Sequence, residues 1–231
     1  MVERETWLLS LRRSNEDEEN ELAEEYDLRW GDIHPVHATW VERFLSLVAP
    51  GGEVLDAACG TGKYLGMVLD SGRRVVGVDH SAAALATARV KHPAAATRHL
   101  DLQDLAFDDE FDGVMCVDAM EFVPPEDWPT VMGAFRRAAR RGAWLYLTVE
   151  LAPSAEVAAL NRELANSGLP VVEGEVLWDQ PDGYYHFHPD MDRVRAWIVD
   201  AGFVIEDDAE GPWMRDDEGT YAYHHVIARP A

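Results

Sequence analysis

Two acids and two glycines at the ends of apolar runs are the residues of this chain with the clearest chemical potential. The stretch VLDAACGTGKY carries Asp56, Gly60 and Gly62, and VVGVDHS ends a second apolar run on Asp79. Glycines in a turn after a strand let the backbone approach a ligand, and an acid about 20 residues further on can accept from two ribose hydroxyls. The spacing predicts a site for a cofactor that contains a nucleoside.

Two phosphate-containing cofactors fit this turn poorly. A P-loop for nucleoside triphosphates needs Gly-x-x-x-x-Gly-Lys-Ser/Thr, but Ala57 stands at its first position and Tyr64 at its last. A dinucleotide turn needs its third glycine one position before Gly66. It would also place Asp56 against the pyrophosphate anions, which electrostatics disfavours. A nicotinamide-dependent oxidoreductase is therefore the weakest alternative.

S-adenosylmethionine carries an ammonium and a sulfonium but no phosphate, and it uses every feature of the turn. Asp56 can meet the ammonium directly or through water. The backbone of the turn can contact the methionine tail, and N–H groups at the start of the next helix can bind its carboxylate. The turn residues concerned are Ala57, Cys59, Gly60 and Gly62.

The nucleoside end of this cofactor has its own candidates. Asp79 is expected to accept from both ribose hydroxyls, and His80, which follows it, to lie against adenine. Asp101 in the stretch RHLDLQDLAF is placed to accept from the adenine amino group. The backbone at Leu102 is then placed to contact the edge of the ring.

These side chains are expected at the carboxyl ends of parallel strands. Short continuous apolar runs alternate with helical patterns, which indicates a mainly parallel sheet covered on both faces. Strands are expected at 53–57, 74–78, 96–100, 111–117 and 143–149, and helices at 63–71, 82–91 and 127–141. The predicted fold class is α/β, with a three-layer, doubly wound architecture.

Segments at both ends of the chain are expected to cover this sheet. Residues 16–25 are acid-rich and predict either a solvated helix capped by Ser14 or Asn15 or a partly ordered arm. Further elements are expected as helices at 37–48, 154–166 and 191–201, an aromatic stretch at 171–189, and terminal strands at 203–206 and 221–228.

From about Trp40 to Arg229 the chain resembles the class I S-adenosylmethionine-dependent methyltransferases. DAACGTG is similar to the first motif of that family and VVGVDHS to its second, and the two together are the specific part of the likeness. HLDLQDLAF resembles the adenine loop, FDGVMCVDAMEFVPPEDW the fourth-strand motif, and GFVIEDD with YHHVIARP the closing hairpin.

That resemblance implies a seven-stranded sheet whose last strand is antiparallel, with Asp118 and Ala119 at the methionine end of the site. It also implies S-adenosylhomocysteine as the product. The chain then divides into an N-terminal acidic arm and cap segment (1–36) and a Rossmann-like methyltransferase domain (37–231) with a cap insertion near 154–190.

Composition narrows the partners and the compartment. A formal net charge of −23 over 231 residues would repel a polyanion, so no nucleic acid is expected as partner. The arginines at 136, 137, 140 and 141 fall in the second half of a predicted helix, where cations suit the helix dipole. No apolar run approaches the roughly 18–20 residues of a membrane span, and the two cysteines form no CxxC pair. The chain also begins without a cleavable apolar core, so we expect a cytoplasmic monomer or homodimer without a membrane partner.

The methyl acceptor is expected beside the covering segments. Tyr26 and Trp30 are predicted to close over the methionine end, where an aromatic cover excludes water and holds a flat or cationic acceptor. In-line transfer needs an aligned nucleophile and a base for its proton. The candidates for that base are His34, His37, Glu121, Glu150 and His186.

Two histidine pairs could instead supply imidazoles to a metal ion. His34 and His37 share a face if their segment is helical, and His186 and His188 share one if theirs is extended. Neither pair is accompanied by other ligands at a recognised spacing, so no metal is predicted.

The sequence therefore predicts S-adenosylmethionine-dependent methyl transfer to an oxygen or nitrogen of a small-molecule metabolite. Two alternatives remain open: an enzyme that acts on protein or RNA, and a cofactor-binding regulator without transfer activity.

Overall fold

Short apolar runs of the chain form the central sheet. The computed structural model describes residues 3–178, 184–215 and 219–231, so positions 179–183 of the predicted cap insertion and 216–218 of the last loop lie outside the described residues. The strands of this sheet are β1 (Glu53–Ala57), β2 (Arg74–Asp79), β3 (Ala96–His99), β4 (Phe111–Cys116), β5 (Ala139–Leu151), β8 (Phe203–Glu210), β9 (Met214–Arg215) and β10 (Thr220–Pro230). They lie in the order β3-β2-β1-β4-β5-β10-β8, with β9 paired to β10.

The last strand reverses the direction of the sheet. Strands β1 to β5 pair in parallel, whereas β10 runs antiparallel to β5 and β8, with Val226 opposite Leu147 and Asp208. Without the two-residue β9, this is the predicted seven-stranded sheet with an antiparallel last strand. The α/β, doubly wound fold class is confirmed.

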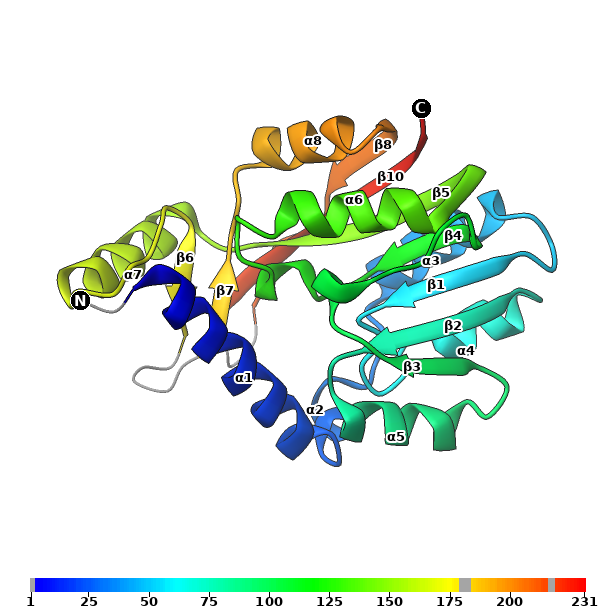
Figure 1. The fold of residues 1–231 in the computed structure, drawn as a ribbon, viewed down its shortest axis with the longest axis horizontal. Helices are drawn as coiled ribbons and strands as arrows, with labels where there is room; N and C mark the ends of the chain where they lie inside the picture. Colours follow the sequence, from blue (N-terminus) through cyan, green and yellow to red (C-terminus); the bar gives the residue numbers. More distant parts are fainter. Residues whose placement is uncertain (1–2, 179–183, 216–218) are drawn as a thin grey trace.

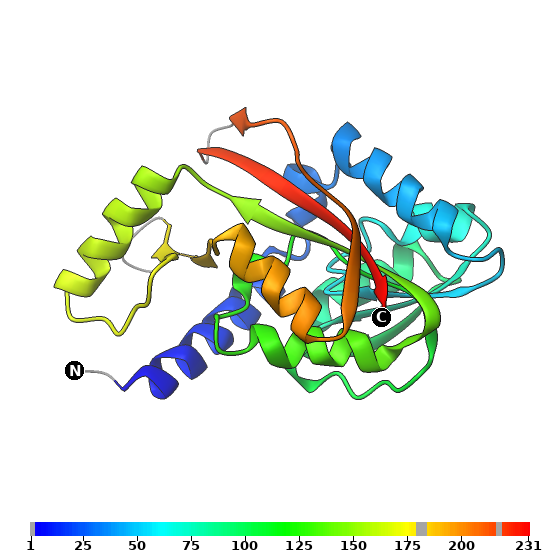
Figure 2. The same cartoon turned by 90° about the horizontal axis from the view of Figure 1, so that it is seen from above.

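Helices cover the sheet on both faces, and Figure 2 shows α6 (Trp128–Ala138) and α8 (Met191–Asp200) on the side opposite α3 (Pro35–Leu47). The ring of Phe44 in α3 lies 6.0 Å from that of Tyr146 in β5. On the other face Trp128 stacks on Trp197 at 5.0 Å. Helices α4 (Leu65–Asp70) and α5 (Ala82–Lys91) contribute to the same apolar cluster as α3. Burial on both faces explains why the strand sequences are continuously apolar.

A small cap follows β5. It consists of α7 (Ser154–Asn166) and a separate two-stranded sheet of β6 (Glu175–Leu177) and β7 (Tyr185–Phe187). Figure 1 shows these elements beyond the carboxyl ends of the parallel strands. Among the helices of the described residues, none has the length and apolar character that a bilayer crossing demands.

The acidic N-terminal segment belongs to a long helix, α1 (Arg4–Leu22), followed by the short α2 (Tyr26–Trp30). The predicted start of a helix at Ser14 or Asn15 was wrong: both residues lie inside α1, and Asn15 is buried. Contacts with distant parts of the chain hold the helix, because the Trp7 ring lies 6.0 Å from that of Tyr185 and Asn20 accepts from Ser81. Figure 1 shows α1 crossing from β7 to α5, beyond the arrowheads of β1 and β2.

Two predicted boundaries shifted because strands extend further than their apolar cores. The helix predicted at 127–141 ends at Ala138, and Arg140 and Arg141 lie in β5, which begins opposite Phe111 of β4. The strand predicted at 203–206 continues to Glu210, since its polar second half pairs with β10.

Candidate active site

The turn after β1 has a left-handed backbone at three positions. Ala58, Gly60 and Gly62 all have positive φ, at 61°, 52° and 86°. A Cβ on Gly62 would also lie 3.0 Å from His92 and 3.1 Å from Leu65, so glycine is needed there for conformation and for space.

Asp79 ends β2 directly beside this turn. One of its oxygens accepts from the Gly60 N–H and the other from the Ser81 N–H, both at 2.8 Å. Each carboxylate oxygen has two lone pairs, so one on each remains for a ligand. Burial, with Glu19 nearby, raises the pKa of Asp79 to about 6, although His80 and the two N–H groups act in the opposite direction.

Asp56 is a buried carboxylate without a counter-charge. Its side chain is 1% exposed, and Oδ2 has no hydrogen-bond partner among the described residues. Burial and the neighbouring Asp79 raise the pKa of Asp56 to about 8. A cation at this position would stabilise the charged form of Asp56.

We expect Asp56→Asn to increase the stability of the ligand-free protein more at pH 8 than at pH 5. Folding raises the pKa of Asp56 from 3.8 to about 8. The protonated carboxyl contributes fully to the free energy of unfolding below pH 3.8. That contribution is lost as the pH rises to about 8, because the unfolded chain releases the proton that the folded chain still holds. Each pH unit in that window corresponds to about 1.4 kcal/mol, so the gain should grow by about 2–4 kcal/mol between pH 5 and pH 8.

Urea unfolding at the two pH values measures this difference, with Asp70→Asn at an exposed helix position as the control. A gain that is the same at both pH values would show that Asp56 titrates normally.

A hydrogen-bonded network surrounds Asp118, which follows β4 with a positive φ of 54°. Tyr64 donates to its carboxylate at 3.1 Å, and Lys63 Nζ lies 3.7 Å from the same oxygen. His37 Nδ1 lies 2.9 Å from the Tyr64 hydroxyl and 3.5 Å from Asp118 Oδ1. Burial acts to raise the pKa of Asp118, but His37 and Lys63 outweigh it and hold that pKa below its usual value. Asp118 is therefore a charged group at this edge.

Tyr26 in α2 lies close to the acids of the site. Burial raises its pKa, and Asp118, Glu19, Glu121 and Asp79 raise it further. The Trp30 ring lies 5.3 Å from that of Tyr26. This position is the one predicted for a cover over the methionine end.

Helix α2 is attached to the glycine turn through Asp27. Asp27 accepts from the Thr61 hydroxyl and from Lys91 Nζ, both at 2.7 Å. The cover and the turn are therefore connected by direct side-chain contacts.

At the position predicted for adenine, Asp101 caps the short helix Leu102–Asp104 by accepting from Gln103 N. His80 Nε2 lies 3.1 Å from Glu19 Oε2 in α1. Burial acts to lower the pKa of His80, but Glu19 and the nearby acids outweigh it and raise that pKa to about 9. His80 is thus held by α1, a contact that its sequence position did not indicate.

The five candidates for a base fall into two groups. His34 and His37 lie together, with ring centroids 6.3 Å apart, but His34 Nδ1 accepts from Val36 N and caps α3. The buried His37 has no partner on Nε2 among the described residues. Of these two histidines, His37 is the buried one.

The second group contains Glu121, Glu150 and His186. Burial raises the pKa of Glu121 well above its usual value, and Glu150 and Asp118 raise it further. His186 Nδ1 lies 2.7 Å from Glu150 Oε2.

Sequence reasoning missed two contributors to the site. Tyr64 was considered only as a mismatch to the P-loop, although its hydroxyl joins His37 to Asp118. Glu19 comes from α1, and no local signal connects an acidic helix to the second strand.

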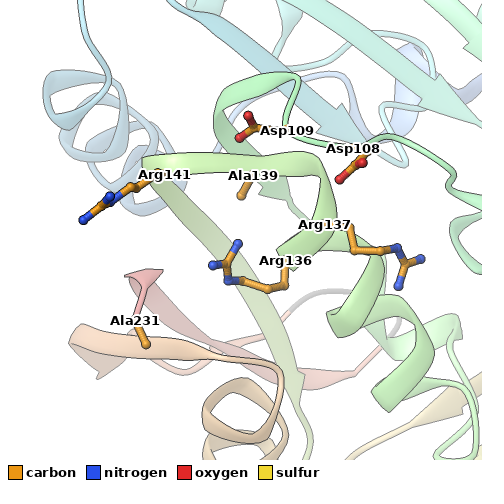
Figure 3. A pocket seen from close by; sticks show the side chains of 7 residues that line it. All are labelled: Asp108, Asp109, Arg136, Arg137, Ala139, Arg141 and Ala231. Atoms are coloured by element: carbon orange, nitrogen blue, oxygen red, sulfur yellow. The ribbon is translucent and has the colours of Figure 1, made fainter.

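A surface hollow lies at the opposite edge of the sheet (Figure 3). It measures about 500 Å³ and is lined by Asp108, Asp109, Arg136, Arg137, Ala139, Arg141 and Ala231. These residues surround the amino ends of β4 and β5 and the carboxyl end of the antiparallel β10. In open α/β sheets ligands bind at the other edge, where Asp56, Asp79 and Asp118 lie. The hollow is therefore separate from the candidate active site.

The strand order, the glycine turn and the acid after β2 together define a nucleoside-binding α/β protein. A family model described as a methyltransferase domain matches residues 54–142, which include β1 to the start of β5. This match, together with the relatives and solved structures described next, supports a class I S-adenosylmethionine-dependent methyltransferase.

Named relatives are methyltransferases. The ubiquinone biosynthesis O-methyltransferase of Pseudomonas paraeruginosa is 28% identical over 185 residues, which cover 76% of this chain and 74% of that protein. The dTDP-3-amino-3,6-dideoxy-alpha-D-glucopyranose N,N-dimethyltransferase of Streptomyces fradiae is 34% identical over 105 residues, or 44% of this chain and 41% of that protein.

Solved structures show the same fold. The 1,6-didemethyltoxoflavin-N1-methyltransferase of Burkholderia thailandensis, crystallised with S-adenosylhomocysteine, superposes with a TM-score of 0.73 at 14% identity, covering 100% of this chain and 92% of that chain. A methyltransferase from Methanosarcina mazei gives 0.70 at 19% identity, covering 86% of this chain and 98% of that chain.

Proposed function

We propose that this enzyme transfers a methyl group from S-adenosylmethionine to an oxygen or nitrogen of a small molecule. The observation that carries the choice of donor is Asp56, a buried carboxylate with an unpartnered oxygen among other acids. A phosphate-free donor with an ammonium and a sulfonium suits this negative edge, whereas a pyrophosphate would be repelled. The relatives named for O- and N-methylation of small molecules support the acceptor class.

We assign the cofactor contacts by position. Asp56 takes the ammonium, and the turn residues Ala57, Cys59, Gly60 and Gly62 contact the methionine tail. Asp79 takes the ribose hydroxyls, while Asp101, Leu102 and His80 surround adenine. Asp118 and Ala119 lie at the methionine end, beneath Tyr26 and Trp30.

His37 is the base that this arrangement favours among the candidates. S-adenosylmethionine would supply an electrophilic methyl group, which the acceptor's lone pair would take as the carbon–sulfur bond breaks and S-adenosylhomocysteine is released. The acceptor's proton passes to Nε2, while Asp118 and Tyr64 hold the ring through Nδ1.

The remaining assignments rest on composition and on the position of segments. We infer that 1–36 acts as a cover and that 154–190 forms the wall of the acceptor site on the 37–231 domain. The charge of −23 supports an acceptor other than nucleic acid, and two buried free cysteines support a reducing compartment such as the cytoplasm.

Ligand-induced stabilisation tests the donor. At 100 times its dissociation constant, S-adenosylmethionine or S-adenosylhomocysteine should stabilise the folded chain by about 2.7 kcal/mol, whereas NAD at the same concentration should have no effect. A scan of the melting temperature with each ligand measures this. Stabilisation by NAD alone would overturn the assignment.

A further inference from the structure

A glutamate from β5 and two histidines from the β7 segment converge in the cap. Glu150 lies near the end of β5, His186 lies in β7, and His188 follows two residues later. One ligand atom from each residue lies within 4.8 Å of the others. The extended segment places both imidazoles on one face, and the third ligand comes from a strand distant in sequence.

The donor atoms in this cluster lack hydrogen-bond partners. His186 Nδ1 and Glu150 Oε2 are 2.7 Å apart, yet both are buried atoms without a hydrogen bond among the described residues, because their alignment is unsuitable. His188 Nε2 is also buried and without a partner. The His186 nitrogen and the Glu150 oxygen are therefore close together without a hydrogen bond between them, an arrangement in which both lone pairs can bind the same cation.

The orientation of His188 is typical of a metal ligand. Its Nδ1 lies 3.3 Å from the carbonyl oxygen of Glu150 and 4.0 Å from Glu150 Oε2. The carbonyl can only accept, so a neutral ring that donates to it through Nδ1 keeps its lone pair on the buried Nε2. A ligating imidazole commonly donates its other N–H to such a carbonyl, which fixes the tautomer. A neutral imidazole with a free lone pair is the form that binds a metal ion.

The surroundings supply a further carboxyl group and an apolar wall. Glu121 is buried, and its Oε2 has no hydrogen-bond partner among the described residues. The Phe122 ring lies edge-on to His186 at 4.9 Å, and the Trp178 ring lies 5.8 Å from that of His188. A partly desolvated cluster of this kind strengthens the attraction for a cation.

We propose that Glu150, His186 and His188 bind a divalent transition-metal ion such as Zn²⁺, Fe²⁺ or Co²⁺. Two imidazoles and one carboxylate select these ions over Mg²⁺ or Ca²⁺, which prefer oxygen ligands. Three protein ligands leave at least one coordination position open. This site replaces the expectation from sequence that the chain holds no metal, because only the fold brings Glu150 to the histidine pair.

The open position has a consequence that rests on the proposed function. A metal beside the acceptor wall would bind an acceptor through a hydroxyl or amine and lower the pKa of that group before it attacks the methyl carbon. Acceptors with a second oxygen or nitrogen able to chelate would then be preferred.

Cobalt titration of the chelator-treated full chain tests the site without any turnover. We expect one equivalent of Co²⁺ to bind with visible absorption bands of a low-coordinate nitrogen and oxygen site, and Zn²⁺ to displace it. His186→Ala and Glu150→Gln should each weaken binding by at least about 10- to 100-fold, on the scale of lost ligand-shell contacts. Glu150→Gln keeps the size of the side chain, and circular dichroism checks that both variants fold.

The matched control is His80→Ala, because Glu19, Asp79 and His80 form the other cluster of this kind among the described residues. This cluster offers a cation less, because both oxygens of Asp79 already accept from backbone N–H groups. His80→Ala should therefore retain Co²⁺ binding.

Three outcomes would overturn the proposal: no bound Co²⁺ in the parent chain, binding that survives both cap substitutions, or binding lost with His80→Ala. S-adenosylhomocysteine affinity, measured by calorimetry on the same samples, should be unchanged in the cap variants. A failure of that measurement in the parent chain would count against the proposed function and not against the metal site.

Discussion

Asp79→Ala should lower the affinity for S-adenosylmethionine by about 10- to 100-fold. The substitution removes a buried carboxylate that can accept from both ribose hydroxyls, and hydrogen bonds to a charged group contribute about 1.5–3 kcal/mol each. It also releases the Gly60 and Ser81 N–H groups, which now share that carboxylate. Isothermal titration calorimetry with S-adenosylhomocysteine measures the change.

Two further variants separate ligand contact from turn geometry. Asp79→Asn keeps one carbonyl acceptor and should bind with an intermediate affinity, while Asp70→Ala removes an exposed acid from α4 and should change nothing. Unchanged affinity in Asp79→Ala, with a folded protein, would remove Asp79 from the cofactor site.

Arg4→Met should lower the free energy of unfolding by about 2–4 kcal/mol, since removal of one partner leaves a buried charge uncompensated. Glu175 is fully buried, and Arg4 donates to its two oxygens at 2.7 and 2.9 Å. Arg4 also donates to the Pro170 carbonyl at 2.6 Å, so it joins α1 to the cap. The arginine is about a fifth exposed, which places the cost below the full range for buried pairs.

The matched substitution is Arg29→Met in α2, where the partner Glu25 is exposed and one helical turn away. That pair should contribute less than about 0.5 kcal/mol. Urea unfolding of both variants decides the matter, and equal losses would mean that Glu175 is not stabilised by Arg4.

Much of the cofactor end could be predicted from the sequence because it is built from neighbouring residues. β1, the glycine turn and β2 form one local unit, in which positive φ at Gly60 and Gly62 and the position of Asp79 follow from residue type and spacing. The continuous apolar runs likewise predicted a parallel sheet covered on both faces. Boundaries were less predictable, since Arg140 and Arg141 belong to β5 only because Ala139 before them and Trp144 after them pair with β4.

The covers and the acceptor end depended on tertiary structure. Local composition predicted a solvated acidic segment, whereas contacts of Trp7, Asn20 and Arg4 with distant residues place α1 along the carboxyl edge. Glu150 and His186 were separate candidates in the sequence, and only the contact between the cap and β5 brings their donor atoms together. Residue type and spacing therefore determined the conformation of the turn proposed to bind the donor, because its geometry is local. The acceptor site was decided by packing between segments far apart in the chain, which no single stretch of sequence encodes.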